Sequence, residues 1–375
     1  MNATVFLILG IAFLVVGADF LVRGASNLAA MAKISPLAIG LTVVAFGTSA
    51  PELAVSLHAT FNNQAELAVG NVVGSNICNV LLILGASALV SPLVVAQQLV
   101  RLDVPIMIGV SGLVFFFGID GSISTSDGVI LVIGGLTYTI FLLYQSRCES
   151  NPEVQNEYAQ EYGPRDFGWS QAGIEFMAFL GGMAFLILGS QMLVRGAVTI
   201  AEALEVNPLI IGLTVVALGT SLPELATSMV ASFRGERDIA VGNVVGSNIF
   251  NILVVLGATS ALSPDGITIA PSVLAFDIPV MIGVAIMCFP ICFNDNLVSR
   301  REGLLLLVYY VAYTLYLVMR TTDHDSTVLF GSALKYIIVP LTILGLTLIM
   351  LRSRLNSSKS KQLSGKQIGG EQIGK

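Results

Sequence analysis

The chain contains one structural unit twice, and this duplication is the strongest constraint on its fold. The block GLTVVAFGTSAPE at 40–52 returns as GLTVVALGTSLPE at 212–224, and AVGNVVGSNICN at 68–79 returns as AVGNVVGSNIFN at 240–251. Both pairs share one offset of 172 residues. The blocks place carboxylates, amides and hydroxyls inside apolar segments, where such groups are costly in a membrane and are kept for function. We therefore expect two equivalent units with equivalent polar residues.

Composition predicts an integral membrane protein. Of 375 residues, 55% are hydrophobic and 11% are charged, whereas a soluble domain carries about 25% charged residues. A membrane span needs about 20 apolar residues. The apolar segments predict an all-α polytopic membrane protein with ten spans in two sets of five, near 3–24, 36–58, 67–90, 102–119, 128–145, 172–196, 208–231, 239–262, 274–294 and 303–319. An eleventh span is expected near 328–351, outside the repeat.

An odd number of spans in each copy predicts inverted repeats. With five spans per copy, the second copy must enter the membrane from the opposite side, and such proteins place the substrate site near the midplane between the copies. The expected organisation is a first repeat at 1–145, a cytoplasmic linker at 146–170, a second repeat at 171–320, an extra span at 321–352 and a disordered basic tail at 353–375.

The distribution of Lys and Arg predicts the orientation, because cytoplasmic loops carry an excess of positive charge. With the N-terminus outside and the C-terminus in the cytoplasm, the inner side holds the tail lysines and Lys33, Arg101, Arg147, Arg165, Arg234, Arg237, Arg300, Arg301, Arg352 and Arg354. Only Arg195, Arg320 and Lys335 then lie outside.

Two Glu residues carry the candidate chemistry. Glu52 and Glu224 occupy equivalent positions, and each follows a Pro that lacks a backbone N–H. The Pro and the preceding Gly predict a break in the helix near mid-membrane, and irregular backbone is tolerated there only when protein buries it or it lines a cavity. Because residues three and four apart share a helix face, Thr48, Ser49 and Ser56 are expected on the face of Glu52.

The second block adds further oxygen donors. Asn71, Ser75 and Asn79 are four residues apart and predict a polar stripe, which the other copy repeats as Asn243, Ser247 and Asn251. Carboxylate, hydroxyl, amide and carbonyl oxygens are hard ligands that suit Ca²⁺ and Na⁺ rather than soft metals. For a single Ser or Gly, helix packing remains an alternative, and the pairs of Asn also fit interhelical hydrogen bonding without ligation.

At these residues the chain resembles the cation/calcium exchanger superfamily, in its sodium/calcium exchanger branch. The family motif GTS-x-PE followed by GSNI-x-N is present at 47–52 with 74–79 and again at 219–224 with 246–251. The similarity covers residues 1–320, and the short link between the copies is typical of prokaryotic members. A bacterial inner (plasma) membrane is therefore the expected location.

The resemblance implies Ca²⁺ and Na⁺ sites that overlap in one pocket. It assigns Glu52 and Glu224 as central ligands, with carbonyls of Thr48 and Thr220 beside them. Ser49, Ser75, Ser221 and Ser247, with the carbonyls of Ala45 and Ala217, would complete flanking Na⁺ sites, and Asn79 and Asn251 would line the middle. Spans one and six would slide as a gate, and the family's coupling would make the cycle electrogenic. Some members carry Asp at one of the two Asn positions, so K⁺ co-transport is not expected here.

The leading functional hypothesis is a secondary active Na⁺/Ca²⁺ antiporter that works by alternating access. An H⁺/Ca²⁺ antiporter is the nearest alternative, because two Glu could exchange protons, and a passive cation channel is the next. An enzyme is not expected, since the chain has no HExxH and no GxSxG motif. A net charge of −6 gives no support for nucleic-acid binding. Beyond the transported ions and the lipid bilayer, no cofactor or partner is predicted, and the sequence sets no oligomeric state.

Overall fold

The computed structural model describes residues 3–32, 34–62, 64–148, 169–205, 217–293, 296–322 and 326–348. The predicted tail at 353–375 lies outside these residues, as does the predicted linker except at its two ends. The first part of the predicted span 208–231 also lies outside them, up to residue 216.

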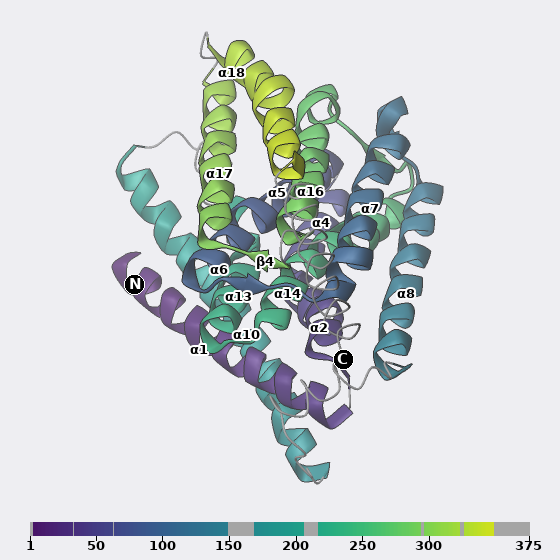
Figure 1. The fold of residues 1–375 in the computed structure, drawn as a ribbon. Coiled ribbons are helices and arrows are strands. Elements are labelled where there is room, and N and C mark those ends of the chain that lie inside the picture. Colours follow the sequence, from purple (N-terminus) through teal and green to yellow (C-terminus); the bar gives the residue numbers. More distant parts are fainter. Residues whose placement is uncertain are drawn as a thin grey trace, which may run out of the picture.

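Helices dominate the described chain, as the sequence predicts (Figure 1). The first copy contains α1 (Ala3–Ala32), α2 (Pro36–Ile39), η1 (Gly40–Val44), α3 (Ala45–Thr48), α4 (Ala50–Phe61), α5 (Ala65–Cys78), η2 (Asn79–Leu84), α6 (Gly85–Val90), η3 (Leu99–Asp103), α7 (Val104–Phe117), η4 (Gly118–Asp120) and α8 (Thr125–Cys148). The second contains α10 (Trp169–Ala203), α12 (Ala217–Thr220), α13 (Leu222–Arg234), α14 (Arg237–Phe250), η6 (Asn251–Leu256), α15 (Gly257–Leu262), η7 (Val273–Asp277), α16 (Ile278–Phe293) and α17 (Arg300–Thr321).

The extra span follows the second copy. It consists of α18 (Thr327–Ala333), η8 (Leu334–Ile338) and the helix that continues to Leu348. Among the described residues, nine helices are long and apolar enough to cross a membrane, or ten if the bent pair Pro36–Thr48 and Ala50–Phe61 forms one span. The one predicted span not represented in this set is 208–231, whose beginning lies outside the described residues.

The helix breaks lie where the sequence predicts them. In the first copy, α3 and α4 meet at Ser49, whose ψ of 5° is not helical, and the two segments differ in direction by 42°. In the second copy, α12 and α13 meet at Ser221, whose ψ is 6°. Pro51 and Pro223 stand at the start of the new helix, where a missing N–H costs little because the first turn has no partner for it.

Several spans contain π-helical segments that the sequence does not predict. The segments η2 and η6 begin at Asn79 and Asn251, the two Asn residues that end the repeated blocks. A second equivalent pair, η3 and η7, ends at Asp103 and Asp277. Such segments within α-helices frequently mark functional sites. The duplication therefore extends to local backbone geometry.

Two short strand pairs join the copies to each other. The strand β1 (Leu93–Val94) of the first copy pairs antiparallel with β4 (Leu297–Val298) of the second, and β2 (Ser122–Ile123) pairs with β3 (Ile267–Thr268). Each pair takes one strand from each copy, so the loops of the copies are tied together at two places.

The first helices of the two copies, α1 and α10, lie along each other across one face of the molecule (Figure 1). Their contact depends on glycine: a Cβ on Gly17 would lie 2.8 Å from the carbonyl oxygen of Gly182, and a Cβ on Gly182 would lie 2.7 Å from that of Gly17. Backbones approach this closely only where small residues face each other.

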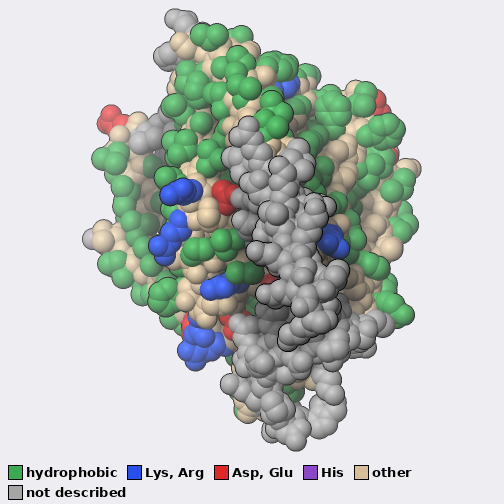
Figure 2. Space-filling model, in the orientation of Figure 1, with side chains coloured by type: hydrophobic (Ala, Val, Ile, Leu, Met, Phe, Trp, Pro, Cys, Tyr) green, Lys and Arg blue, Asp and Glu red, His purple; other side chains and the backbone are tan. Residues whose placement is uncertain are grey.

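The third span of each copy forms the centre of the bundle. In the span Arg237–Leu262, 94% of the most apolar stretch is buried, and in Leu67–Val90 the share is 78%, compared with 17% for the extra span. Many large hydrophobic side chains are exposed, and they are spread over the surface on both sides of the residues drawn in grey (Figure 2). This distribution suits a bundle surrounded by lipid, with the repeated polar blocks at its core.

Candidate cation site

Two fully buried carboxylates face the opposite copy. Glu52 and Glu224 are both 0% exposed, and each lies in the first turn of the helix that follows the break. The Oγ of Ser221 donates a hydrogen bond to Oε1 of Glu52 at 3.2 Å, and the Oγ of Ser49 donates to Oε1 of Glu224 at 3.1 Å. Each Glu is thus held by the Ser at the break of the other copy, and the two breaks lie against each other.

The second oxygen of each carboxylate has no hydrogen-bond partner. The same is true of the side-chain oxygens of Asn79, Asn251 and Ser247, and all five atoms are buried. Buried polar atoms in proteins are nearly always paired, so a group of unpaired oxygens requires an explanation. Seven other buried side-chain oxygens in the described residues are also unpaired, but these five share one place, the two repeated blocks in which the sequence predicts cation ligands.

Threonine and asparagine side chains connect the breaks to the central spans. The Oγ1 of Thr48 donates to Oδ1 of Asn243 at 3.0 Å, and in the other copy Thr220 donates to Asn71 at 3.4 Å. The Nδ2 of Asn71 donates in turn to the backbone carbonyl of Glu52 at 3.2 Å. Its counterpart Asn243 makes the same bond to Glu224 at 3.4 Å. These bonds fix the backbone on which both carboxylates stand.

Ser75 and Ala45, two of the remaining predicted residues, lie beside the helix breaks. The Oγ of Ser75 lies within hydrogen-bond distance of the Oγ of Ser221, at 3.2 Å. The carbonyl of Ala45 accepts from the N–H of Ser49 at 3.0 Å and lies 3.4 Å from the Oγ1 of Thr48. For Ala217, the structure describes its position at the start of α12 and no further contact.

Asn79 and Asn251 each form a hydrogen bond to the other copy. The Nδ2 of Asn79 donates to Oδ1 of Asn248, and the Nδ2 of Asn251 donates to Oδ1 of Asn76, both at 3.1 Å. Interhelical hydrogen bonding, one of the two interpretations of these residues, is therefore present. Because each bond uses the amide nitrogen, the oxygens stay unpaired.

Three polar residues near the site have no role in the sequence-based prediction. Asn76 and Asn248 lie inside the GSNI motif, so their repetition was visible although their partners were not. Ser190 on α10 donates a hydrogen bond of 2.5 Å to the carbonyl of Gly219, which Pro223 leaves without its helical partner. No repeated pattern marks Ser190, because Ala18 occupies the equivalent position.

The donor set consists of hard oxygen atoms. No group of three or more His, Cys, Asp or Glu suited to a metal occurs in the described ranges. The two carboxylates are instead surrounded by hydroxyl and amide oxygens. Such a set has the chemistry of sites for Ca²⁺ or Na⁺ and lacks the sulfur and imidazole ligands that favour zinc or copper.

Comparison with known proteins agrees with this chemistry. A family model described as sodium/calcium exchanger protein matches residues 2–147 and 174–319. Inner membrane protein YrbG of Escherichia coli is 39% identical over 300 residues, which cover 78% of this chain and 90% of that protein. Sodium/calcium exchanger MaX1 of Methanosarcina acetivorans is 33% identical over 339 residues, with 82% of this chain and 96% of the relative covered.

Solved structures give the same family. A structure of the sodium–calcium exchanger NCX_Mj superimposes with a TM-score of 0.70 at 29% identity, covering 82% of this chain and 96% of that one. The family model matches both copies of the repeat and more than half of the chain. The chain therefore belongs to the sodium/calcium exchanger family as a prokaryotic-type member, an integral membrane cation/Ca²⁺ antiporter and not an enzyme.

Proposed function

We propose that this chain is a secondary active Na⁺/Ca²⁺ antiporter that works by alternating access. Ca²⁺ and Na⁺ compete for one pocket between the two copies, near the midplane of the membrane. Its ligands are Glu52 and Glu224, with oxygens of Thr48, Thr220, Ser49, Ser221, Ser75, Ser247, Asn79, Asn251, Ala45 and Ala217.

The observation that carries the proposal is the pair of buried carboxylates with one unpaired oxygen each. Two ionised carboxylates inside a bundle are costly unless a cation compensates them. One Ca²⁺ balances their charge of −2. The ion takes 6–8 oxygen ligands at about 2.3–2.6 Å, and the neighbouring unpaired oxygens of Asn79, Asn251 and Ser247 supply more of them.

Coupling to Na⁺ follows from the same ligands. Na⁺ also prefers hard oxygens, and the hydroxyls at both breaks lie beside the carboxylates rather than apart from them. Ions that share ligands exclude each other, so filling the pocket with Na⁺ releases Ca²⁺. The names of the relatives MaX1 and NCX_Mj support Na⁺ as the second ion.

The inverted repeat supports alternating access. Transporters of this plan expose one central site to either side of the membrane by moving one part against the other. The helices α1 and α10 contact each other closely and form a natural moving pair. The distribution of Lys and Arg favours an external N-terminus and a cytoplasmic C-terminus, and the bacterial inner membrane is the proposed location.

Transport into liposomes tests the coupling ion. Purified protein is reconstituted into vesicles that contain Na⁺, and uptake of radiolabelled Ca²⁺ is followed after dilution into Na⁺-free medium. A second arm replaces internal Na⁺ with choline and imposes a pH gradient. A third arm has neither gradient, and protein-free vesicles provide the background.

Each outcome separates one function from the others. We expect Ca²⁺ uptake only with the outward Na⁺ gradient. Uptake driven by the pH gradient alone would instead make the chain an H⁺/Ca²⁺ antiporter. Uptake that needs neither gradient would make it a passive cation channel and would overturn alternating access.

A further inference from the structure

Four asparagines and two methionines form two equivalent chains of hydrogen bonds between the copies. In the first, Nδ2 of Asn248 lies 3.3 Å from Sδ of Met107, and Oδ1 of Asn248 accepts from Asn79 at 3.1 Å. In the second, Nδ2 of Asn76 lies 3.8 Å from Sδ of Met281, and Oδ1 of Asn76 accepts from Asn251 at 3.1 Å. Both chains have the same order: a methionine, then an asparagine of the GSNI motif (Asn248 or Asn76), then the asparagine that ends the repeated block (Asn79 or Asn251), called the pocket asparagine below.

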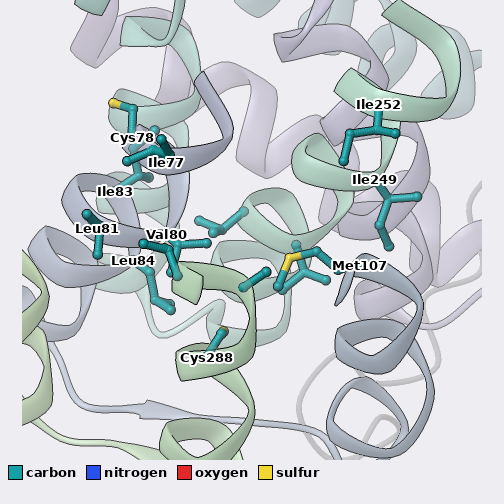
Figure 3. Close-up of a cluster of buried hydrophobic side chains, with 14 of the residues drawn as sticks. Ile77, Cys78, Val80, Leu81, Ile83, Leu84, Met107, Ile249, Ile252 and Cys288 are labelled. Atoms are coloured by element: carbon teal, nitrogen blue, oxygen red, sulfur yellow. The ribbon is translucent and has the colours of Figure 1, made fainter. Parts of the chain in front are cut away.

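Burial isolates these chains from water. The exposed fractions of Asn76, Asn79, Asn248 and Asn251 are 3%, 1%, 2% and 0%. Met107 is also fully buried. It lies on α7, which packs against α14 with Ile249 and against η6 with Ile252 (Figure 3). Because water does not reach these amides, their hydrogen bonds within the protein decide how they are oriented.

The chemistry of the end groups fixes the direction of each chain. A side-chain amide donates through nitrogen and accepts through oxygen, and a thioether can only accept. Met107 therefore faces the NH₂ group of Asn248, which turns the oxygen of Asn248 toward Asn79. Asn79 must then present its own NH₂ group to Asn248 and its oxygen to the opposite side. That oxygen, Oδ1 of Asn79, is one of the unpaired buried atoms.

The second chain has the same direction and one additional support. The Nδ2 of Asn76 also donates to the backbone carbonyl of Asn248 at 3.1 Å, so its oxygen is again free for Asn251. The Oδ1 of Asn251 is likewise unpaired and buried. The side-chain oxygens of Asn79 and Asn251 are thus oriented by Asn248 and Asn76, whose own side-chain oxygens already accept hydrogen bonds.

The pocket asparagines lie beside the helices that carry the two carboxylates. Asn79 begins η2, which packs against α13 with Glu224, and Asn251 begins η6, which packs against α4 with Glu52. Each pocket asparagine therefore lies on a segment that packs against the helix carrying the Glu of the opposite copy.

We propose that Asn76 and Asn248, together with Met281 and Met107, are positioning residues that hold the amide oxygens of Asn251 and Asn79 toward the transported cation. This proposal rests on the proposed function, since it assigns these oxygens to the same Ca²⁺ pocket. We call each chain of hydrogen bonds, from methionine to pocket asparagine, a relay. Without its relay, each pocket asparagine can turn its NH₂ group toward the cation, which weakens Ca²⁺ binding.

A double-mutant cycle on Ca²⁺ binding tests the relay. Isothermal titration calorimetry on purified full-length protein gives the Ca²⁺ affinity of Asn248→Ala, Asn79→Ala and the double variant. Loss of residues that orient ligands typically weakens metal binding about 10- to 100-fold, and we expect about tenfold for Asn248→Ala. Because Asn248 acts through Asn79, it should have no further effect when Asn79 is already Ala.

The matched control combines Asn248→Ala with Asn251→Ala. Asn251 lies three residues from Asn248 on the same span but belongs to the other relay. We expect Asn248→Ala to retain its full factor in this background. An equal factor in both backgrounds would mean that Asn248 only supports the helix packing, and the relay would be overturned.

Methionine variants keep the test independent of folding defects. Met107→Leu preserves volume and removes only the sulfur acceptor, so we expect a two- to threefold loss of Ca²⁺ affinity, which disappears when Asn79 is Ala. Met287→Leu is the control, because Met287 is equally buried and belongs to neither relay. Equal losses in Met107→Leu and Met287→Leu would overturn the role of the sulfur.

The binding assay also separates this inference from the function on which it rests. Coupling between Asn248 and Asn79 in Ca²⁺ binding, with uptake that ignores the Na⁺ gradient, would support the relay and overturn Na⁺ coupling. Na⁺-driven uptake without that coupling would leave the antiporter intact and overturn the relay. A wild-type protein that binds no Ca²⁺ would overturn both.

Discussion

The two copies of the unit carry the same candidate ligands but support them with different neighbours. In both, a Glu accepts a hydrogen bond from the Ser at the opposite break, and an Asn on the third span holds the backbone of that Glu. Outside this shared centre the copies differ. Ser190 binds the freed carbonyl of Gly219, whereas the equivalent position in the first copy is Ala18.

Charge at the edge of the bundle differs as well. Asp19 on α1 forms ion pairs with Arg23 and with Arg234 at the end of α13. The equivalent residues are Gln191 and Asn62, which are neutral. In agreement with this, α1 packs along α13, whereas α10 and α4 hardly touch among the described residues. Equivalence at the centre with divergence at the periphery indicates that the ligands, and not the whole unit, require symmetry.

The largest expected effect tests the equivalence of the two carboxylates. Glu52→Gln and Glu224→Gln should each abolish Ca²⁺ transport in liposomes, because each removes half of the negative charge of the pocket. The matched control is Glu202→Gln, an exposed residue on α10, which should transport normally. Substantial activity in either pocket variant would show that the copies are not equivalent and that the site is misassigned.

The next effect tests the contact between the first helices of the copies. A Cβ on Gly182 would lie 2.6 Å from the backbone nitrogen of Leu21, whereas a Cβ on the neighbouring Gly181 meets nothing within 4 Å. Overpacking costs about 1–3 kcal/mol, so Gly182→Ala should lower the melting temperature in detergent and Gly181→Ala should not. Equal melting temperatures would mean that the contact between α1 and α10 accommodates the extra methyl group without cost.

A smaller effect distinguishes the two helix breaks. Ser190→Ala leaves the buried carbonyl of Gly219 without its donor, which should destabilise the protein by about 1–2 kcal/mol. Thr199→Ala removes an exposed hydroxyl on the same helix that bonds its own helix carbonyl, and should have almost no effect. Thermal unfolding of both variants checks the difference. If Ser190→Ala melts like the wild type, the hydrogen bond from Ser190 does not stabilise the second break, and the two breaks are equivalent in this respect.

The smallest effect concerns the ion pair at the edge. Asp19 and Arg234 have side chains that are 33% and 27% exposed, so their pairing should contribute at most about 1 kcal/mol. Asp19→Asn should lower the melting temperature slightly, and added salt should reduce the difference from the wild type. Gln191→Glu, at the equivalent position, can pair only with Arg195 on its own helix, because Asn62 stands where the other copy has Arg234, so its salt-dependent gain should be smaller than the loss in Asp19→Asn. A salt-independent difference would point to packing instead of charge.

Repetition made much of the architecture predictable. Ten of the predicted spans correspond to described helices, and the breaks at Ser49 and Ser221 follow from the missing N–H of Pro51 and Pro223. These features depend on short sequence patterns. The π-helical segments and the strand pairs depend on contacts between distant residues, and no local pattern in the chain indicates them.

Repetition gives no signal for contacts that only one copy makes. No repeated pattern marks Asp19, because Gln191 replaces it in the second copy, yet it links α1 to α13. Ser190 was missed for the same reason. Asn76 and Asn248 were visible as repeated residues, but their partners lie in the other copy and on α7 and α16, so only the three-dimensional arrangement connects them.

The strand pairs β1–β4 and β2–β3, each with one strand from each copy, bear on how such a chain could originate. A half-length polypeptide has one strand for each pair and no partner for either. Two identical halves inserted in opposite directions would complete both pairs, since the same interaction occurs twice about a two-fold axis. The present chain keeps the plan of that homodimer. Once a linker had fused the halves, a single substitution no longer changed both at once, and residues such as Asp19 and Ser190 could specialise on one side only.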